Sequence, residues 1–261
     1  MRSKERFFIF LFVFIFIMFV SLIMIFGTTI YAEYYDADVT IDDQGNITIE
    51  ERLTMNYPEG YDVIFRDIIY DKHANRTGNY GLNQSTFDQT SVEVRIYDQN
   101  DVKIYDSLNP TSNARIGYSY LNDRDELGGL VECAPEVLSK TNKCESIFIQ
   151  VFNGFDRKMT FEYKYTILGA ITQYQDISEL NWRLFDYFDS QIKGANVRVH
   201  LPSHSYTLDD DIYMFGHGLY DGSIYFDSPS KVTLDIGNMR GGDFLEFRFL
   251  FPNSVVANIS Q

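Results

Sequence analysis

Long stretches of this chain alternate apolar and polar side chains with a period of two. The alternation is clearest in the runs 92–96, 159–167, 197–201, 232–236 and 245–251. Side chains on a β-strand point alternately to opposite faces of the sheet, so each run predicts a strand with one buried and one wet face. This pattern is typical of antiparallel sheets, since strands in parallel sheets are buried on both faces.

Shorter runs with the same period occur at 34–41, 46–56, 63–70, 145–152 and 222–227. Turn-forming residues separate them, above all at 42–46, where Gly45 follows two Asp and one Gln in what resembles a hairpin loop. About ten strands without interleaved helices predict an all-β fold, an antiparallel β-sandwich. A division near residue 170, where a predicted strand ends, would give two packed sandwich subdomains.

Three segments depart from the alternation. Residues 176–190 are the one candidate for a short helix, with Asp176 as its cap and Ile177, Leu180, Leu184 and Phe188 on one face. The stretches 71–91 and 106–144 are polar and too long for hairpin turns, which indicates functional loops or insertions.

The N-terminus carries a membrane-targeting signal. Residues 7–26 are apolar at every position except Ser21, long enough as a helix to cross the roughly 30 Å hydrocarbon core. Basic residues precede this run, which places the N-terminus in the cytoplasm and residues 33–252 outside. Ala32 suits a cleavage site, but Ile30 does not, and the run exceeds the ~7–15 residues of a usual signal peptide. Residues 1–32 are therefore predicted to be either a cleaved signal peptide or a signal-anchor helix that holds residues 7–30 in the cytoplasmic membrane.

Charge divides along the same boundary. The chain has 22 basic and 37 acidic residues, of which the first 32 residues hold three and one, so residues 33–261 carry 19 against 36, a net charge of −17. Such a surface excludes nonspecific binding to nucleic acid and argues against electrostatic docking on anionic lipid.

Cys133 and Cys144 are the only cysteines. In a translocated domain they predict a structural disulfide, worth about 3 kcal/mol in the chain-entropy model. A metal site would need a second pair of ligands, which this spacing lacks.

Other candidate ligands have ordinary structural interpretations. The histidines are expected to be structural or surface residues, because none belongs to a His-Glu-x-x-His motif; they are His73, His200, His204 and His217. The densest acidic cluster is a weak candidate for calcium, and a solvated loop is the simpler interpretation; it comprises Asp209, Asp210 and Asp211, with Asp221 and Asp227 nearby. No catalytic or cofactor-binding motif occurs in the sequence.

Two groups of short segments carry a family resemblance. The first group is 35–41 (YDADVTI), 43–45 (DQG), 47–51 (ITIEE) and 64–68 (IFRDI); the second is 176–182 (DISELNW), 197–202 (VRVHLP), 216–218 (GHG), 222–224 (GSI) and 245–252 (LEFRFLFP). Together they resemble the N-terminal extracellular domain of the bacterial predicted-membrane-protein family DUF2207. The resemblance implies an exported β domain followed by membrane helices, whereas here residues 253–261 form only a short tail. It singles out structural residues and no catalytic ones: Gly45, Glu50, Glu51, Arg66, Trp182, Gly216, Gly218 and Pro252.

Glu51 and Arg66 form a candidate buried ion pair. Glu51 shares strand parity with apolar Ile49 and Leu53, so it is expected on the core side, where Arg66 could neutralise it. Trp182, the only Trp, is expected to fill the core rather than to stack on a sugar.

The sequence favours a non-catalytic β module, tethered or secreted, that contacts another envelope protein or polymer. The alternative is a cell-surface hydrolase that uses carboxylates on cell-wall glycan. That enzyme would need two carboxyl groups about 5–9.5 Å apart in a concave pocket, one with a raised pKa. A calcium-stabilised module is a third possibility.

Overall fold

The computed structural model describes residues 30–57, 61–70, 85–118, 144–155, 157–185, 188, 190–202, 212–218 and 221–256. These residues form strands and one short 3-10 helix, η2 (Asn253–Val256). The strands are β1 (Tyr31–Ile41), β2 (Ile47–Asn56), β3 (Val63–Ile69), β4 (Thr86–Tyr97), β5 (Lys103–Asp106), β6 (Ala114–Tyr118), β7 (Cys144–Val151), β8 (Lys158–Leu168), β9 (Thr172–Gln173), β10 (Ile177–Phe185), β11 (Gln191–Ile192), β12 (Ala195–His200), β13 (Tyr213–His217), β14 (Gly222–Ser228), β15 (Lys231–Ile236) and β16 (Leu245–Pro252). The prediction of an all-β fold is confirmed for this part of the chain.

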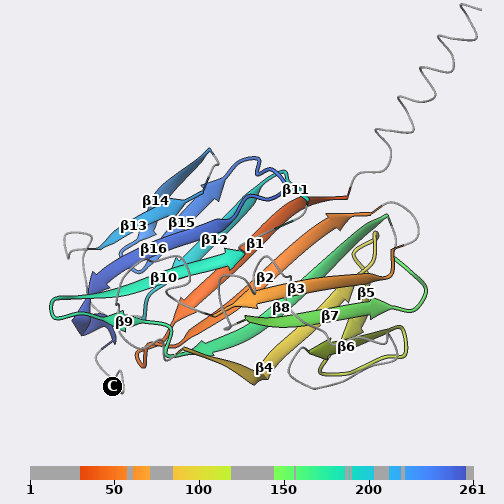
Figure 1. Cartoon of the computed structure of the whole chain (residues 1–261), viewed down its shortest axis with the longest axis horizontal. Coiled ribbons are helices and arrows are strands. Elements are labelled where there is room, and N and C mark those ends of the chain that lie inside the picture. Colours follow the sequence, from red (N-terminus) through yellow and green to blue (C-terminus); the bar gives the residue numbers. More distant parts are fainter. Residues whose placement is uncertain are drawn as a thin grey trace, which may run out of the picture.

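The strands form three sheets. The largest has nine strands in the order β14-β15-β12-β1-β2-β8-β4-β5, with β11 beside β1. A four-stranded sheet, β13-β16-β10-β9, and a three-stranded sheet, β3-β7-β6, complete the described fold. Figure 1 shows these two smaller sheets side by side across one face of the large sheet. The opposite face of the large sheet is its outer face.

One hydrophobic core joins the three sheets. The apolar residues of the alternating runs form this core: in β2, β12 and β16 every second residue is buried, and the residues between are only partly buried or exposed. The core includes Tyr165 from the large sheet, Trp182 from the four-stranded sheet and Ile149 from the three-stranded sheet. Trp182 is 2% exposed, so it fills the core as predicted.

All ten predicted strands are present, as β1, β2, β3, β4, β7, β8, β12, β14, β15 and β16. The expectation of purely antiparallel sheets is wrong at one place, since β1 pairs in parallel with both β12 and β11. A parallel pairing needs a long crossover, and the chain between β1 and β12 passes through all three sheets before it returns. The outer face of β1 and β12 remains partly exposed, so their alternation did not distinguish parallel from antiparallel pairing.

The predicted helix at 176–190 is also wrong, because its first half forms strand β10. The buried residues Leu180, Trp182 and Leu184 are spaced by two and face the core. Strand β10 pairs with the Phe-rich β16, where Trp182 lies opposite Phe247 and Leu180 opposite Phe249. Leu180 and Leu184 fit both a helical and a strand period, and the pairing with β16 decides between them.

Several predicted features can be placed against these elements. The turn between β1 and β2 is closed by a hydrogen bond from the Gly45 amide to the Asp42 carbonyl (3.2 Å), and Gly45 has a φ of 81° that suits glycine. Strands from before and after residue 170 lie in the same large sheet.

Residues 1–29, 71–84, 119–143 and 257–261 lie outside the described residues. Within the described part, no helix has the length and apolar character needed to cross a membrane.

Candidate functional site

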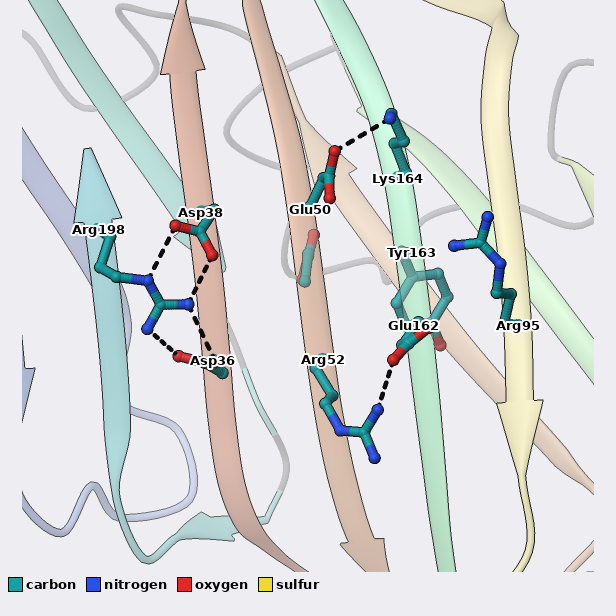
Figure 2. A pocket seen from close by; sticks show the side chains of 10 residues that line it. Asp36, Asp38, Glu50, Arg52, Arg95, Glu162, Tyr163, Lys164 and Arg198 are labelled. Carbon is teal, nitrogen blue, oxygen red and sulfur yellow. Dashed lines mark hydrogen bonds and ion pairs between the residues drawn. The ribbon is translucent and has the colours of Figure 1, made fainter. Parts of the chain in front are cut away.

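A polar groove of about 210 Å³ lies on the outer face of the large sheet. Its lining residues come from five neighbouring strands, β12, β1, β2, β8 and β4 (Figure 2), and all except Glu51 and Tyr163 occupy the polar positions of the alternation. The residues that line it are Asp36, Asp38, Glu50, Glu51, Arg52, Arg95, Glu162, Tyr163, Lys164 and Arg198. Glu51 and Tyr163 point to the core, where they are buried, so we infer that they contribute to the floor of the groove.

Arg198 holds both carboxylates on one side of the groove. Its guanidinium donates to Asp36 Oδ1 and Oδ2 at 2.7 and 3.0 Å, and to Asp38 Oδ1 and Oδ2 at 2.8 and 2.6 Å. This double fork follows from the parallel register, which sets Arg198 directly beside Asp38. Burial acts to raise the pKa of the Asp38 carboxyl, but hydrogen bonds from Arg198 and His200 outweigh it and hold the pKa below its ordinary value.

Two further ion pairs cross the other side of the groove, between β2 and β8. Lys164 Nζ lies 3.0 Å from Glu50 Oε1, and Arg52 donates to Glu162 while also binding Asp101 at 2.8 Å. Figure 2 shows these pairs directed away from the Arg198 cluster, on the far side of the groove. Such cross-strand pairs between exposed groups stabilise the wet face of a sheet modestly, each by about 0.2–1 kcal/mol.

Beneath the groove, on the core face of the same strands, lies a buried ionic cluster. Arg66 from β3 donates to Glu51 of β2 through Nε (3.0 Å to Oε2) and Nη2 (2.9 Å to Oε1). The Tyr35 hydroxyl donates to Glu51 Oε2 at 2.9 Å, and the Tyr165 hydroxyl donates to Oε1. Arg66 also donates to the Leu184 carbonyl of β10 at 2.7 Å. One guanidinium therefore joins all three sheets.

Burial dominates the electrostatics of this cluster. It raises the pKa of the Tyr35 and Tyr165 hydroxyls well above the usual value, and the adjacent Glu51 carboxylate raises them further. The Tyr163 hydroxyl, whose pKa burial also raises, has no hydrogen-bond partner among the described residues. All three phenols thus remain neutral across the physiological pH range, and those of Tyr35 and Tyr165 remain donors to Glu51.

The carboxylates that line the groove are all held in ion pairs. Each of its carboxylates has a cationic partner at hydrogen-bond or ion-pair distance: Asp36 and Asp38 have Arg198, Glu50 has Lys164, Glu51 has Arg66 and Glu162 has Arg52. A general acid needs a raised pKa, whereas the shift at Asp38 is downward. Among the described residues, no three His, Cys, Asp or Glu side chains are grouped so that they could hold a metal ion.

The structure brings some of the predicted residues together and separates others. It joins Glu51 to Arg66, and it places Glu50 on the opposite face of β2, in the groove. Gly216 lies in β13, Gly218 follows that strand and Pro252 ends β16, all away from the groove.

The other candidate ligands either have structural roles at the surface or lie outside the described residues. Asp227 pairs with Lys231 at 3.1 Å, His200 lies beside Asp38 and His217 ends β13. Cys144 begins β7, but Cys133 lies outside the described residues, so the disulfide stays a prediction. The remaining candidates also lie outside the described residues; they are His73, His204, Asp209, Asp210 and Asp211.

The sequence had not singled out the Arg198 cluster, Arg52, Glu162 or Lys164. Their only local signal is that each occupies a polar position of an alternating run. That signal says which face a side chain occupies, but it does not say which strands are neighbours.

Comparisons with known proteins give one family and several distant structural neighbours. The profile of DUF2207, described as the N-terminal domain of a predicted membrane protein, matches residues 31–251. No curated protein matches the chain. Solved structures that resemble it include a candidate protease from Parabacteroides distasonis (10% identity, TM-score 0.44, 84% of this chain and 40% of that one) and native yeast LTA4 hydrolase (9%, 0.41, 85% and 29%). The M1 zinc metallopeptidase of Deinococcus radiodurans is similar at 9% identity (TM-score 0.39, 84% and 42%). The chain spans less than half the length of each, and similarity at this level assigns no activity.

Proposed function

The chain belongs to the DUF2207 family of predicted membrane proteins, and we propose on this premise that its β domain is a non-catalytic module that binds another envelope protein through the outer-face groove. The observation that carries the proposal is the fixed pattern of charge in the groove. Cations and carboxylates of five strands are held at defined positions by one another and remain partly exposed. Complementary charge on a partner would be recognised specifically, and mismatched charge would be rejected.

A protein partner suits this groove better than a glycan does. Sugars are commonly held by exposed aromatic rings, whereas the one aromatic residue lining the groove, Tyr163, is 2% exposed. A polypeptide partner could instead supply Lys, Arg, Asp and Glu side chains in a complementary order.

The same proposal covers attachment and orientation. Residues 7–30 would hold the chain in the cytoplasmic membrane, with the β domain outside the cell, or the domain would be released if the chain were cleaved after Ala32. Fractionation of the expressing cells followed by intact-mass measurement separates these outcomes. We expect the full-length mass in the membrane fraction, whereas a mature N-terminus at Glu33 would show that the domain is secreted.

The binding role can be tested by exchanging charges within one exposed pair. In Glu50→Lys/Lys164→Glu, the internal ion pair survives but the charge offered to a partner is reversed. The matched control is Asp227→Lys/Lys231→Asp, an exposed pair of the same sheet outside the groove. A photo-crosslinking residue at position 40, which is exposed on the outer face of β1 two residues beyond Asp38 and outside the groove lining, reports contact with the partner in living cells; it is placed in both exchanges and in the otherwise unmodified chain.

We expect a discrete protein adduct in the unmodified and control backgrounds and a loss of about tenfold or more in the groove exchange, since one mispaired charge readily changes binding by over 1.4 kcal/mol. An equal adduct in all three backgrounds would refute the groove as the binding face. An adduct that glycosidases remove would identify a glycan partner instead.

The hydrolase alternative makes an opposite prediction. A carboxylate enzyme would release fragments from cell-wall glycan, and neutralising Glu50 or Glu162 would abolish the release. The ion pairing of every groove carboxylate and the lowered pKa of Asp38 favour the binding role over this chemistry.

A further inference from the structure

The fold begins almost directly after the apolar segment. Residue 26 ends the apolar run and β1 begins at Tyr31, so five Cα–Cα steps separate them. Fully extended, these steps span at most about 18 Å. The headgroup layer on one side of a bilayer takes up about 5–8 Å of that length. A membrane-held chain would therefore keep the start of β1 within roughly 10–13 Å of the headgroup surface.

The start of β1 is also fixed firmly to the rest of the domain. Tyr31 and Ala32 pair with β2 on one side and with β11 on the other. Ala32 is fully buried, and its carbonyl accepts a hydrogen bond from the Lys193 amide at 3.0 Å. No flexible linker therefore lies between Ile30 and the sheet, and the short tether constrains the whole domain.

Two exposed aromatic side chains lie at this same end of the molecule. Tyr31 lies level with Asn56 of β2, and Asn56 lies level with Lys158 of β8. Tyr61, at the start of the segment leading into β3, and Phe152, just after β7, are 41% and 55% exposed. Backbone hydrogen bonds place them beside the end of β2, since the Val151 amide donates to the Asp62 carbonyl at 2.8 Å and the Phe155 amide to the Tyr61 carbonyl at 2.6 Å, while the Tyr57 amide donates to the Arg157 carbonyl at 2.8 Å. Figure 1 shows the start of β1 and the ends of β2 and β7 on the same side of the molecule.

An aromatic cluster supports these exposed residues from within. The ring of Tyr57, directly after β2, lies 5.9 Å from that of Tyr61 and 4.6 Å from that of Phe155. At the start of β1, Lys193 Nζ sits 3.7 Å above the Tyr31 ring. Tyrosine rings and long cationic side chains are the residues that favour the headgroup region of a membrane.

We propose that this end of the domain, marked by Tyr31, Tyr61 and Phe152, rests on the phospholipid surface, an inference that rests on the proposed attachment through residues 7–30. The contact is apolar and interfacial, because the net charge of −17 on residues 33–261 disfavours electrostatic docking. Strand β1 then leads away from the membrane. Asp36 and Asp38 lie five and seven residues beyond Tyr31, so the groove opens about 17–24 Å above this end.

The test uses tryptophan as a depth probe in the full-length chain reconstituted into phosphatidylcholine vesicles whose acyl chains are brominated near the headgroup. The membrane-end variants are Tyr61→Trp and Phe152→Trp. The matched control is Leu168→Trp, because Leu168 is 41% exposed at the other end of β8, ten residues or about 34 Å from Lys158. Trp182 is buried and gives a constant background that the unmodified chain measures.

We expect the bromolipids to quench the two membrane-end probes at least about threefold more than the control, with little change in high salt because the contact is apolar. Equal quenching at both ends, or quenching at neither end in a chain that floats with the vesicles, would overturn this inference and leave the proposed attachment intact. A full-length chain that does not float with the vesicles would overturn the attachment and this inference together.

Discussion

Arg66 is the residue whose loss should weaken the domain most. Its side chain is 8% exposed and that of Glu51 is fully buried, so Arg66→Met would leave the Glu51 carboxylate in the core with two phenol donors and no cation. Breaking a buried ion pair by removing one partner costs about 3–5 kcal/mol. The substitution also removes the hydrogen bond to the Leu184 carbonyl, one of the contacts with the four-stranded sheet. We expect a loss of about 3–5 kcal/mol, against a total stability for such a domain of about 5–15 kcal/mol.

Urea unfolding followed by Trp182 fluorescence measures this effect, because Trp182 is the only Trp and lies two residues from Leu184 in β10. In the double variant Glu51→Gln/Arg66→Met no unpaired charge remains, so its loss should be smaller than the sum of the two single losses by about 1–3 kcal/mol. The control is Arg52→Met, which adjoins Glu51 on the exposed face of β2 and should cost no more than about 1 kcal/mol. Additive single losses, or an Arg66→Met loss no greater than that of Arg52→Met, would refute the assigned role of the cluster.

Three further predictions concern the same core and its edge. Tyr163→Phe removes a buried hydroxyl without a described partner and should stabilise the domain by about 1 kcal/mol, whereas Tyr165→Phe removes a donor to the buried carboxylate and should destabilise it by about 1.5–3 kcal/mol; urea unfolding compares them directly. Burial raises the folded-state pKa of both tyrosines above the unfolded value of about 10, so above pH ~10 the unfolded chain loses phenol protons that the folded chain keeps. The free energy of unfolding is therefore unaffected by these two groups below pH ~10 and decreases above it. The free energy of unfolding should fall by about 1.4 kcal/mol per pH unit for each such tyrosine, and Tyr163→Phe should reduce that slope when unfolding is followed between pH 9 and pH ~11.5. Gly222→Ala should destabilise the domain by about 1–3 kcal/mol in thermal unfolding, because the new Cβ would lie 2.8 Å from the Asp235 carbonyl oxygen. Gly194→Ala should be nearly neutral, because its Cβ would approach the Tyr34 ring at 3.4 Å and the Ile236 carbonyl oxygen at 3.8 Å.

The alternation in the sequence predicted strands well, because a strand with one buried and one wet face shows in its own residues which side chains point to the core. It also placed Glu51 on the core face of β2, since parity within one strand is a local property. Tyr35 and Tyr165, which complete the cluster, could not be assigned to it in the same way. They reach Glu51 only through the register of β1 and β8 against β2, which depends on contacts across the whole chain.

The prediction failed where the same apolar residues fit both the helical period and the strand period of two. At 176–190, Leu180 and Leu184 are four residues apart and fit either a helix or a strand. The distinguishing residue is Trp182, which a helix would turn away from that face and which the structure buries against β16. A lone large aromatic between two leucines at a spacing of two therefore carried the strand signal, and its preferred partner lay more than 60 residues away.

The groove could not be predicted from the alternation, because the alternation does not show which strands are neighbours. Its central contact joins Arg198 to Asp36 and Asp38, which are 160 or more residues away in the sequence. The two segments that hold these residues, 35–41 and 197–202, were both part of the family resemblance, yet nothing in either segment says that they lie side by side in parallel. Once that register is known, the rest follows from parity, because the inward residues of both strands build the core and the outward residues must meet one another on the wet face. The positions that specify the fold thus alternate with those proposed to specify the partner, so the charged face can be altered in pairs while the core remains unchanged.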